Sequence, residues 1–265
     1  MFKRIILTSE FPEEVNWKKA LKLIEFKSEI YIAVKNKKEF LKYRKKIKSK
    51  HINLGAWPTL PKEEGYWFSG FTSKKSINKL KEFKGMKIKI DLEPPIPLFN
   101  YNNIKIILWL IKLYFKKAKN KEYLRNVIYW LANNNTKILV NEFPLPKCYL
   151  KKLGITIKKQ KNMTLQMMMY TSPVGRFFRP IMKVYNKIML KKALRKNKDM
   201  VASIGLIGPG ILKTEGCYKK TEEFLEDLKM VQNISVKNIA VYSIDAIMKR
   251  KHPESWLKTL KEFTS

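Results

Sequence analysis

The sequence predicts a single closed (β/α)8 barrel over residues 1–265. Eight short β-branched or aliphatic runs alternate with stretches in which apolar residues recur at helical spacing, and this alternation is typical of a parallel sheet. The length of 265 residues suits one barrel domain and leaves little for a second. The alternative, an open doubly wound sheet, is disfavoured because no Gly-x-Gly-x-x-Gly turn follows the first strand.

The predicted elements follow one another along the whole chain. The strands are expected at Arg4–Thr8, Glu29–Val34, His51–Gly55, Met86–Asp91, Lys137–Asn141, Met163–Tyr170, Met200–Ile204 and Asn238–Ile244. The helices are expected near 15–26, 37–49, 74–83, 102–132, 147–152, 176–197, 219–232 and 253–263. Active sites of such barrels lie at the C-terminal ends of the strands, so these ends are where functional residues are sought.

The stretch Lys87–Pro95 is predicted to be a strand that carries two carboxylates at its end. Side chains alternate along a strand, so Asp91 and Glu93 lie on one face, and Pro94 and Pro95 then end the ladder. Two close carboxylates raise the proton affinity of one of them, which suits general acid and base catalysis. The alternative is an exposed pair that merely solvates a loop.

Other predicted strands also end in polar or aromatic residues. These strand-end residues are Glu10, Trp57, Glu142, Gln166, Tyr170, Tyr242 and Asp245. Because the C-terminal ends of barrel strands meet at one rim, we expect these side chains to converge there with Asp91 and Glu93.

Three strand ends resemble those of family-18 glycoside hydrolases, the chitinase-like barrel enzymes. The matching motifs are Asp91-x-Glu93-x-Pro95, Met168-x-Tyr170 and Tyr242-Ser-x-Asp245. The resemblance implies that Glu93 protonates the glycosidic oxygen and that Asp91 orients the N-acetyl group of the substrate as an internal nucleophile. It further implies that the Tyr170 hydroxyl assists that group and that Tyr242 forms a stacking floor for a sugar.

The sequence departs from the family pattern at four positions. Met86 and Lys89 stand at the first two acidic positions of the strand-four signature, Thr171 replaces the Asp after the Tyr, and Tyr242 replaces a Trp. Lys89 shares a strand face with Asp91, so we expect the two to pair and Asp91 to be held ionised. In that case Glu142 or Asp245 is the expected second carboxylate of a direct acid and base hydrolysis.

Large aromatic side chains cluster around the predicted third strand and the loop after it. They are Trp57, Tyr66, Trp67, Phe68 and Phe71. Flat aromatic rings suit the apolar faces of sugars, so Trp57 and Trp67 are candidate binding residues for a glycan substrate. The alternative is a loop that folds back on itself as a small core.

The charge of the chain supports a second hypothesis. With 56 Lys and Arg against 22 Asp and Glu, the net charge is +34, which attracts polyanions nonspecifically. Ile104–Phe115 and the stretch 175–185 combine an apolar body with a cationic rim, as interfacial segments do, but both are too short to span a bilayer. The alternative function is therefore a catalytically degraded barrel that binds anionic polymer or a membrane surface. No motif indicates sequence-specific nucleic-acid binding.

The histidine and cysteine content and the N-terminal sequence bear on cofactors and on the location of the protein. Two histidines, His51 and His252, are too few for a typical metal-dependent barrel hydrolase, so we expect neither a metal nor another cofactor. The alternative is a Mg²⁺ ion bound by the carboxylates of Asp91 and Glu93 alone. Cys148 and Cys217 lack metal-like spacing and are expected to be reduced thiols. Because only Ile5–Leu7 is apolar near the N-terminus, we expect no signal peptide and a cytoplasmic protein, with peripheral membrane attachment as the alternative.

Overall fold

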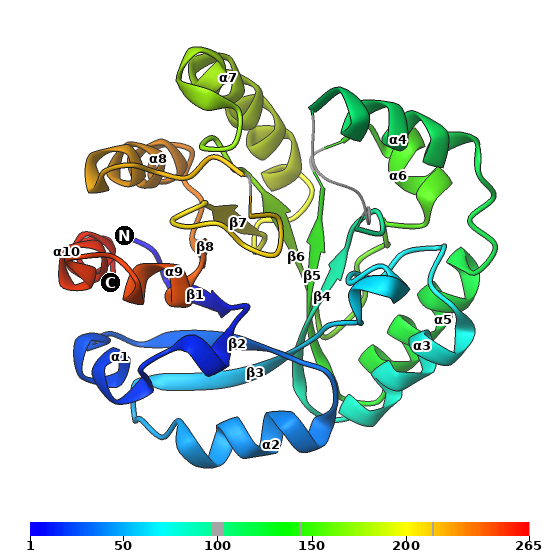
Figure 1. Ribbon diagram of the computed structural model, residues 1–265, viewed down its shortest axis with the longest axis horizontal. Coiled ribbons are helices and arrows are strands. Elements are labelled where there is room, and N and C mark those ends of the chain that lie inside the picture. The colour runs from blue at the N-terminus through cyan, green and yellow to red at the C-terminus, as the bar shows by residue number, and fades with distance from the viewer. Residues whose placement is uncertain (97–102, 144, 214, 265) are drawn as a thin grey trace. The chain divides into compact units, whose positions relative to one another are not determined.

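The computed structural model describes residues 1–96, 103–143, 145–213 and 215–264. Eight parallel strands form one closed barrel in the order in which they occur in the sequence (Figure 1). The strands are β1 Arg4–Ser9, β2 Ser28–Val34, β3 Ile52–Pro58, β4 Lys87–Leu92, β5 Lys137–Glu142, β6 Met163–Met168, β7 Val201–Ile204 and β8 Asn238–Tyr242. The predicted (β/α)8 barrel is confirmed, with the carboxylate-bearing segment as its fourth strand.

Helices connect the strands. They are α1 Trp17–Leu23, α2 Lys37–Lys46, α3 Lys74–Asn78, α4 Asn103–Phe115, α5 Lys121–Asn133, α6 Lys147–Leu153, α7 Gly175–Leu194, α8 Thr221–Asn233, α9 Ile244–Met248 and α10 Pro253–Lys261. Short 3-10 helices cover Pro12–Glu14, Lys62–Glu64 and Lys79–Phe83. None of the helices in the described ranges is both long enough and apolar enough to cross a bilayer.

The single helix predicted over 102–132 is wrong, because the chain forms α4 and α5 there; residue 102 lies outside the described residues. The interruption lies at Asn120, whose backbone N–H donates to the carbonyl of Gly70 at 2.9 Å. The Asn120 side chain donates to the carbonyl of Thr72, also at 2.9 Å. These tertiary bonds hold the chain at the start of α5.

The sixth and eighth strands end earlier than predicted, at Met168 and Tyr242. After β8 the chain enters α9, where the Ser243 hydroxyl caps the helix by accepting from the N–H of Ala246 at 3.3 Å. Asp245 therefore lies in the first turn of α9, and Tyr170 lies just beyond the end of β6.

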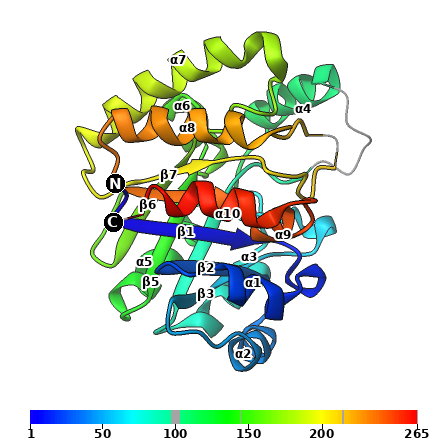
Figure 2. The same ribbon diagram turned by 90° about the vertical axis from the view of Figure 1, so that its left-hand side faces the viewer.

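The chain divides into two compact units, each of which is described by itself below. Unit 1 comprises Met1–Ala33, Leu41–Gly55 and Gln166–Ser265, and unit 2 comprises Val34–Phe40 and Ala56–Leu165. In unit 1, α8 and α10 lie side by side (Figure 2), with the rings of Phe224 and Trp256 5.7 Å apart. That the chain is one domain stays a prediction.

The strand registers place the candidate residues. In unit 2, β4 pairs with β5 over six positions, with Asp91 opposite Asn141 and Leu92 opposite Glu142. In unit 1, β1 pairs with β8, and Thr8 lies opposite Tyr242. Within each unit, the register thus places polar residues at the ends of neighbouring strands directly beside one another.

Candidate functional site

In unit 2, the loop after β3 fixes the end of β4. Phe68 forms a parallel bridge with Leu92, donating its N–H to the carbonyl of Asp91 at 3.1 Å. The carbonyl of Phe68 accepts from the N–H of Glu93 at 3.3 Å. Tyr66 and Phe68 are buried, so the loop folds back at these positions, whereas Trp67 is half-buried. The backbone that carries both carboxylates is thus held by hydrogen bonds on its loop side.

Gly65 lets this loop approach the segment after β4. Its φ of +101° lies in the left-handed region, and a Cβ added there would lie 2.9 Å from the Cβ of Pro95. The carbonyl of Gly65 accepts from the N–H of Ile96 at 2.9 Å. Only glycine satisfies both the backbone conformation and the close approach.

Asp91 and Glu93 lie on the same face of β4 and are both buried, with exposed fractions of 3% and 6%. The side-chain amide of Asn141 donates to Oε1 of Glu93 at 3.3 Å. Asn141 also stabilises the ionised form of Asp91 through a hydrogen bond. The expected carboxylate pair is therefore present, and an amide from β5 joins it.

Lys89 and Asp91 form the ion pair that the sequence predicts, in a position where both side chains are buried. The Lys89 ammonium also lies 3.8 Å from the centroid of the Trp57 ring, within the range of a cation–π contact. Burial is the largest effect and leaves the pKa of Asp91 above its ordinary value, although Lys89, Asn141 and Trp57 act in the opposite direction. Trp57 is only 1% exposed and interacts with both Lys89 and Asp91.

Glu142 follows Asn141 on β5 and points to the opposite side of the strand, because side chains alternate. Its Oε1 accepts from the Thr156 hydroxyl at 2.8 Å and from the N–H of Ile157 at 3.2 Å. Glu142 thereby holds the segment after α6. Asn141 is the β5 residue that lies with the carboxylates, and its register with Asp91 is the signal that could have identified it.

In unit 1, Glu10 follows β1 and connects three segments. The Tyr242 hydroxyl donates to Oε2 of Glu10, and the N–H of Ile211 donates to the same oxygen at 2.9 Å. The N–H of Glu10 donates to Oδ1 of Asp245 at 3.1 Å, and the Ser243 hydroxyl donates to Oδ2 at 3.0 Å. Glu10, Tyr242 and Asp245 therefore form one hydrogen-bonded group.

Gly210 borders this group closely. A Cβ added to Gly210 would lie 1.9 Å from the hydroxyl oxygen of Tyr242 and 2.6 Å from Oε2 of Glu10. Tyr170 contributes a second aromatic ring, whose centroid lies 6.1 Å from that of Tyr242, and its hydroxyl lies 3.4 Å from that of Ser203. Gln166 is buried on β6, also within unit 1.

Two carboxyl groups of unit 1 titrate near neutral pH. Burial raises the pKa of Asp245 to about 6. Burial, together with the negative charge of Glu10, raises the pKa of Glu215 to about 7. Burial also raises the pKa of Tyr242, so its hydroxyl keeps its proton. Glu215 was missed by sequence reasoning, since its proximity to Glu10 arises only in the folded chain.

The raised pKa of Asp245 predicts a pH-dependent stability. Its stabilising contribution is fully present below the ordinary value of 3.8 and is lost as the pH rises through about 6. The full change corresponds to about 3 kcal/mol in the free energy of unfolding. Urea unfolding at pH values between 4 and 7 is expected to show this decline, and Asp245→Asn is expected to flatten it. An unchanged pH profile in the variant would show that another group causes the decline.

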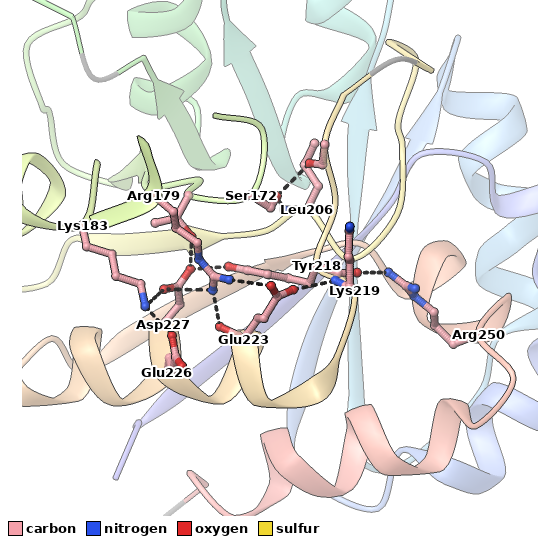
Figure 3. Close-up of polar contacts among 12 residues, drawn as sticks. Ser172, Arg179, Lys183, Leu206, Tyr218, Lys219, Glu223, Glu226, Asp227 and Arg250 are labelled. Atoms are coloured by element: carbon pink, nitrogen blue, oxygen red, sulfur yellow. Dashed lines mark hydrogen bonds and ion pairs between the residues drawn. The ribbon is translucent and has the colours of Figure 1, made fainter. Parts of the chain in front are cut away.

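A second polar cluster in unit 1 surrounds Asp227 of α8, which is fully buried (Figure 3). Its Oδ2 accepts from the hydroxyls of Thr171 and Tyr218, the latter at 2.6 Å. Its Oδ1 lies 3.5 Å from the Lys183 ammonium and 3.7 Å from the Arg179 guanidinium. Thr171, which stands where the resembled family has Asp, is thus part of the bonding between α7 and α8.

Among the described residues, no group of three or more His, Cys, Asp or Glu could hold a metal ion. The chemistry that the two units offer is proton transfer and hydrogen bonding by buried carboxyl, amide and phenol groups.

Comparison with solved structures finds barrel proteins that match almost the whole chain. The GH18 chitinase from Pseudoalteromonas aurantia is 11% identical, with 98% of this chain and 99% of that chain covered and a TM-score of 0.58. The PgaB (BpsB) glycoside hydrolase domain from Bordetella bronchiseptica is 10% identical, with 98% and 99% covered and a TM-score of 0.53. A xylose isomerase domain protein from Planctomyces limnophilus is 9% identical, with 98% and 96% covered and a TM-score of 0.51.

No family model matches the chain, and no curated protein sequence matches it. At identities this low, the likeness shows the fold alone: a TIM barrel of the kind found in glycoside hydrolases of the chitinase family. The isomerase neighbour illustrates that the same fold carries other chemistry.

Proposed function

We propose that this barrel is a glycoside hydrolase in which Glu93 is the general acid. The observation that carries the proposal is the buried pair of Asp91 and Glu93 on one face at the end of β4, with Asn141 bonded to Glu93. Glycoside hydrolysis needs a carboxylic acid that protonates the leaving oxygen and a second group that stabilises the developing positive charge. The chitinase-like barrels among the structural neighbours fit a glycan substrate.

Within this proposal, Asp91 orients the N-acetyl group of the substrate, with Lys89 as its counter-ion. The ion pair favours the ionised form of Asp91 and so acts against the burial that raises the pKa of this carboxyl group. Asn141 donates to Glu93 and holds its carboxyl group in one orientation. The roles of Tyr170, Tyr242, Glu10, Gln166 and Asp245 stay predictions. Within this proposal Glu142, which accepts from Thr156 and Ile157, has no catalytic role.

A catalytically degraded barrel that binds an anionic polymer or a membrane surface is the second candidate. The ion pair between Lys89 and Asp91 favours this second candidate, because the Lys89 ammonium competes with a substrate amide for the Asp91 carboxylate. The net charge of +34 favours it as well.

Calorimetric titration with a chito-oligosaccharide at low and at physiological salt tests the proposal. A neutral sugar that stacks on the half-buried Trp67 is expected to bind with nearly equal affinity at both salts. Trp67→Ala is expected to weaken binding by about tenfold, since it removes the apolar platform. Trp130→Ala, which removes an exposed ring on α5, is the matched control and should leave binding unchanged. Absence of sugar binding at both salts would exclude the glycosidase proposal.

A further inference from the structure

Three polar side chains tie helix α7 to the rest of unit 1. Arg179 donates to the carbonyl of Glu223 at 2.6 Å and pairs with the Glu223 carboxylate at 3.1 Å (Figure 3). Lys183 lies 3.5 Å from Asp227. One turn further along, the Asn186 amide is fully buried and donates to the carbonyl of Met169 at 3.0 Å. These contacts fix the rotation of α7 about its own axis.

The opposite face of α7 is apolar and exposed. Six side chains form this surface, here called the α7 stripe: Phe177 (92% exposed), Phe178 (65%), Ile181 (67%), Val184 (57%), Tyr185 (36%) and Ile188 (60%). Phe177, Ile181, Val184 and Ile188 recur at spacings of four, three and four residues, which places them in one row along the helix. A barrel helix ordinarily buries its apolar row against the sheet. In α7 this row is exposed, although Leu190 of the same helix is fully buried.

The charged residues around the α7 stripe indicate which kind of partner binds it. Lys187, Lys191, Lys192 and Arg195 are exposed along the C-terminal half and end of α7, and the helix sequence contains no acidic residue. A second copy of this chain would bring the same cations, and another net charge of +34, against them. An anionic lipid surface suits both the basic residues and the apolar row. Its headgroups attract the lysines, and the apolar side chains insert at the boundary with the acyl chains.

We propose that α7 lies in the plane of an anionic bilayer surface, with the α7 stripe inserted into the acyl boundary and its basic residues on the headgroups. The helix is 20 residues long and is not apolar enough to span the bilayer, which agrees with an orientation parallel to the surface. The ties of Arg179, Lys183 and Asn186 to unit 1 keep the stripe facing outward in the free protein. The surface is therefore formed before lipid is encountered.

Flotation of the purified protein with vesicles tests the proposal. Vesicles of neutral phosphatidylcholine are compared with vesicles that contain about a third phosphatidylglycerol, at low and at physiological salt. We expect binding to the anionic vesicles and little to the neutral ones. Replacing Ile181 and Ile188 by Ser together is expected to lower the partition coefficient at least tenfold, because two apolar side chains no longer leave water.

Matched variants distinguish vesicle binding through the α7 stripe from nonspecific binding through the positive charge of the whole chain. Lys187→Gln, Lys191→Gln and Lys192→Gln together should weaken binding several-fold more than Lys42→Gln, Lys45→Gln and Lys46→Gln, which remove the same charge from α2. A matched aliphatic pair on α4, Leu108→Ser with Ile111→Ser, should leave binding unchanged. Circular dichroism checks that each variant is folded.

Three outcomes would overturn the proposal. The first is no binding of the parent to anionic vesicles at low salt. The second is that the parent and the Ile181→Ser, Ile188→Ser variant bind equally well, or that only the Leu108→Ser, Ile111→Ser variant of α4 loses vesicle binding. The third is a parent that is dimeric in solution and becomes monomeric on the same two α7 substitutions, since the stripe would then be a protein interface.

Discussion

Glu93→Gln is expected to reduce glycan hydrolysis by about 10²- to 10⁴-fold while the fold stays intact. The amide has the shape of the carboxyl group but cannot donate the proton that the leaving oxygen needs. Glutamine can still accept the 3.3 Å hydrogen bond from Asn141, so the buried surroundings of the side chain are kept. The rate is measured with a chromogenic chito-oligosaccharide that the parent protein cleaves.

Glu142→Gln is the matched control, because Glu142 lies at the end of the neighbouring strand but on its other side. Its carboxylate accepts from Thr156 and Ile157, and an amide oxygen can accept the same bonds, so the rate should change less than tenfold. If the Glu93 variant were as fast as the parent while the Glu142 variant lost activity, the assignment of the acid to Glu93 would be wrong.

Asp227→Ala is expected to lower the free energy of unfolding by about 3–5 kcal/mol, as loss of one partner of a buried ion pair does. The substitution leaves the cations of Arg179 and Lys183 without a buried counter-charge. It also deprives the hydroxyls of Tyr218 and Thr171 of their acceptor. Urea unfolding followed by circular dichroism measures the change.

Glu226→Ala provides the comparison, because Glu226 pairs with the same Lys183 at 2.6 Å but is 61% exposed. Solvent screens that pair, so the expected loss is below about 1 kcal/mol. Equal losses in the two variants would mean that the Asp227 cluster contributes no more than a surface pair.

The strands could be predicted from the sequence because each is a short apolar run, and such runs alternate with stretches of helical period along the whole chain. The break between α4 and α5 could not, since Asn120 bonds to Gly70 and Thr72, about fifty residues earlier in the chain. Local sequence in that region is helical throughout. These tertiary bonds, and not the local propensity, fix the start of α5 at Lys121.

The carboxylate pair and its cation were predictable for a similar reason. Alternation along one strand places Lys89, Asp91 and Glu93 on one face, and this needs no knowledge of the rest of the fold. Asn141 required the register of β4 with β5, and the burial that raises the pKa values of Asp245 and Glu215 required the folded chain. For α7 the periodicity shows a polar and an apolar row, but only the position of Asp227 decides which row faces inward.

The bridge between Phe68 and Leu92 has a consequence for the entropy of substrate recognition. The two backbone hydrogen bonds of Phe68 are made to Asp91 and Glu93 themselves, so the main chain at Glu93 is ordered when the protein folds. Under the proposed function, a substrate would meet a carboxyl group whose main chain is already ordered. The conformational entropy of this backbone would then be lost during folding rather than on substrate binding, so more of the binding energy would be available for the proposed reaction.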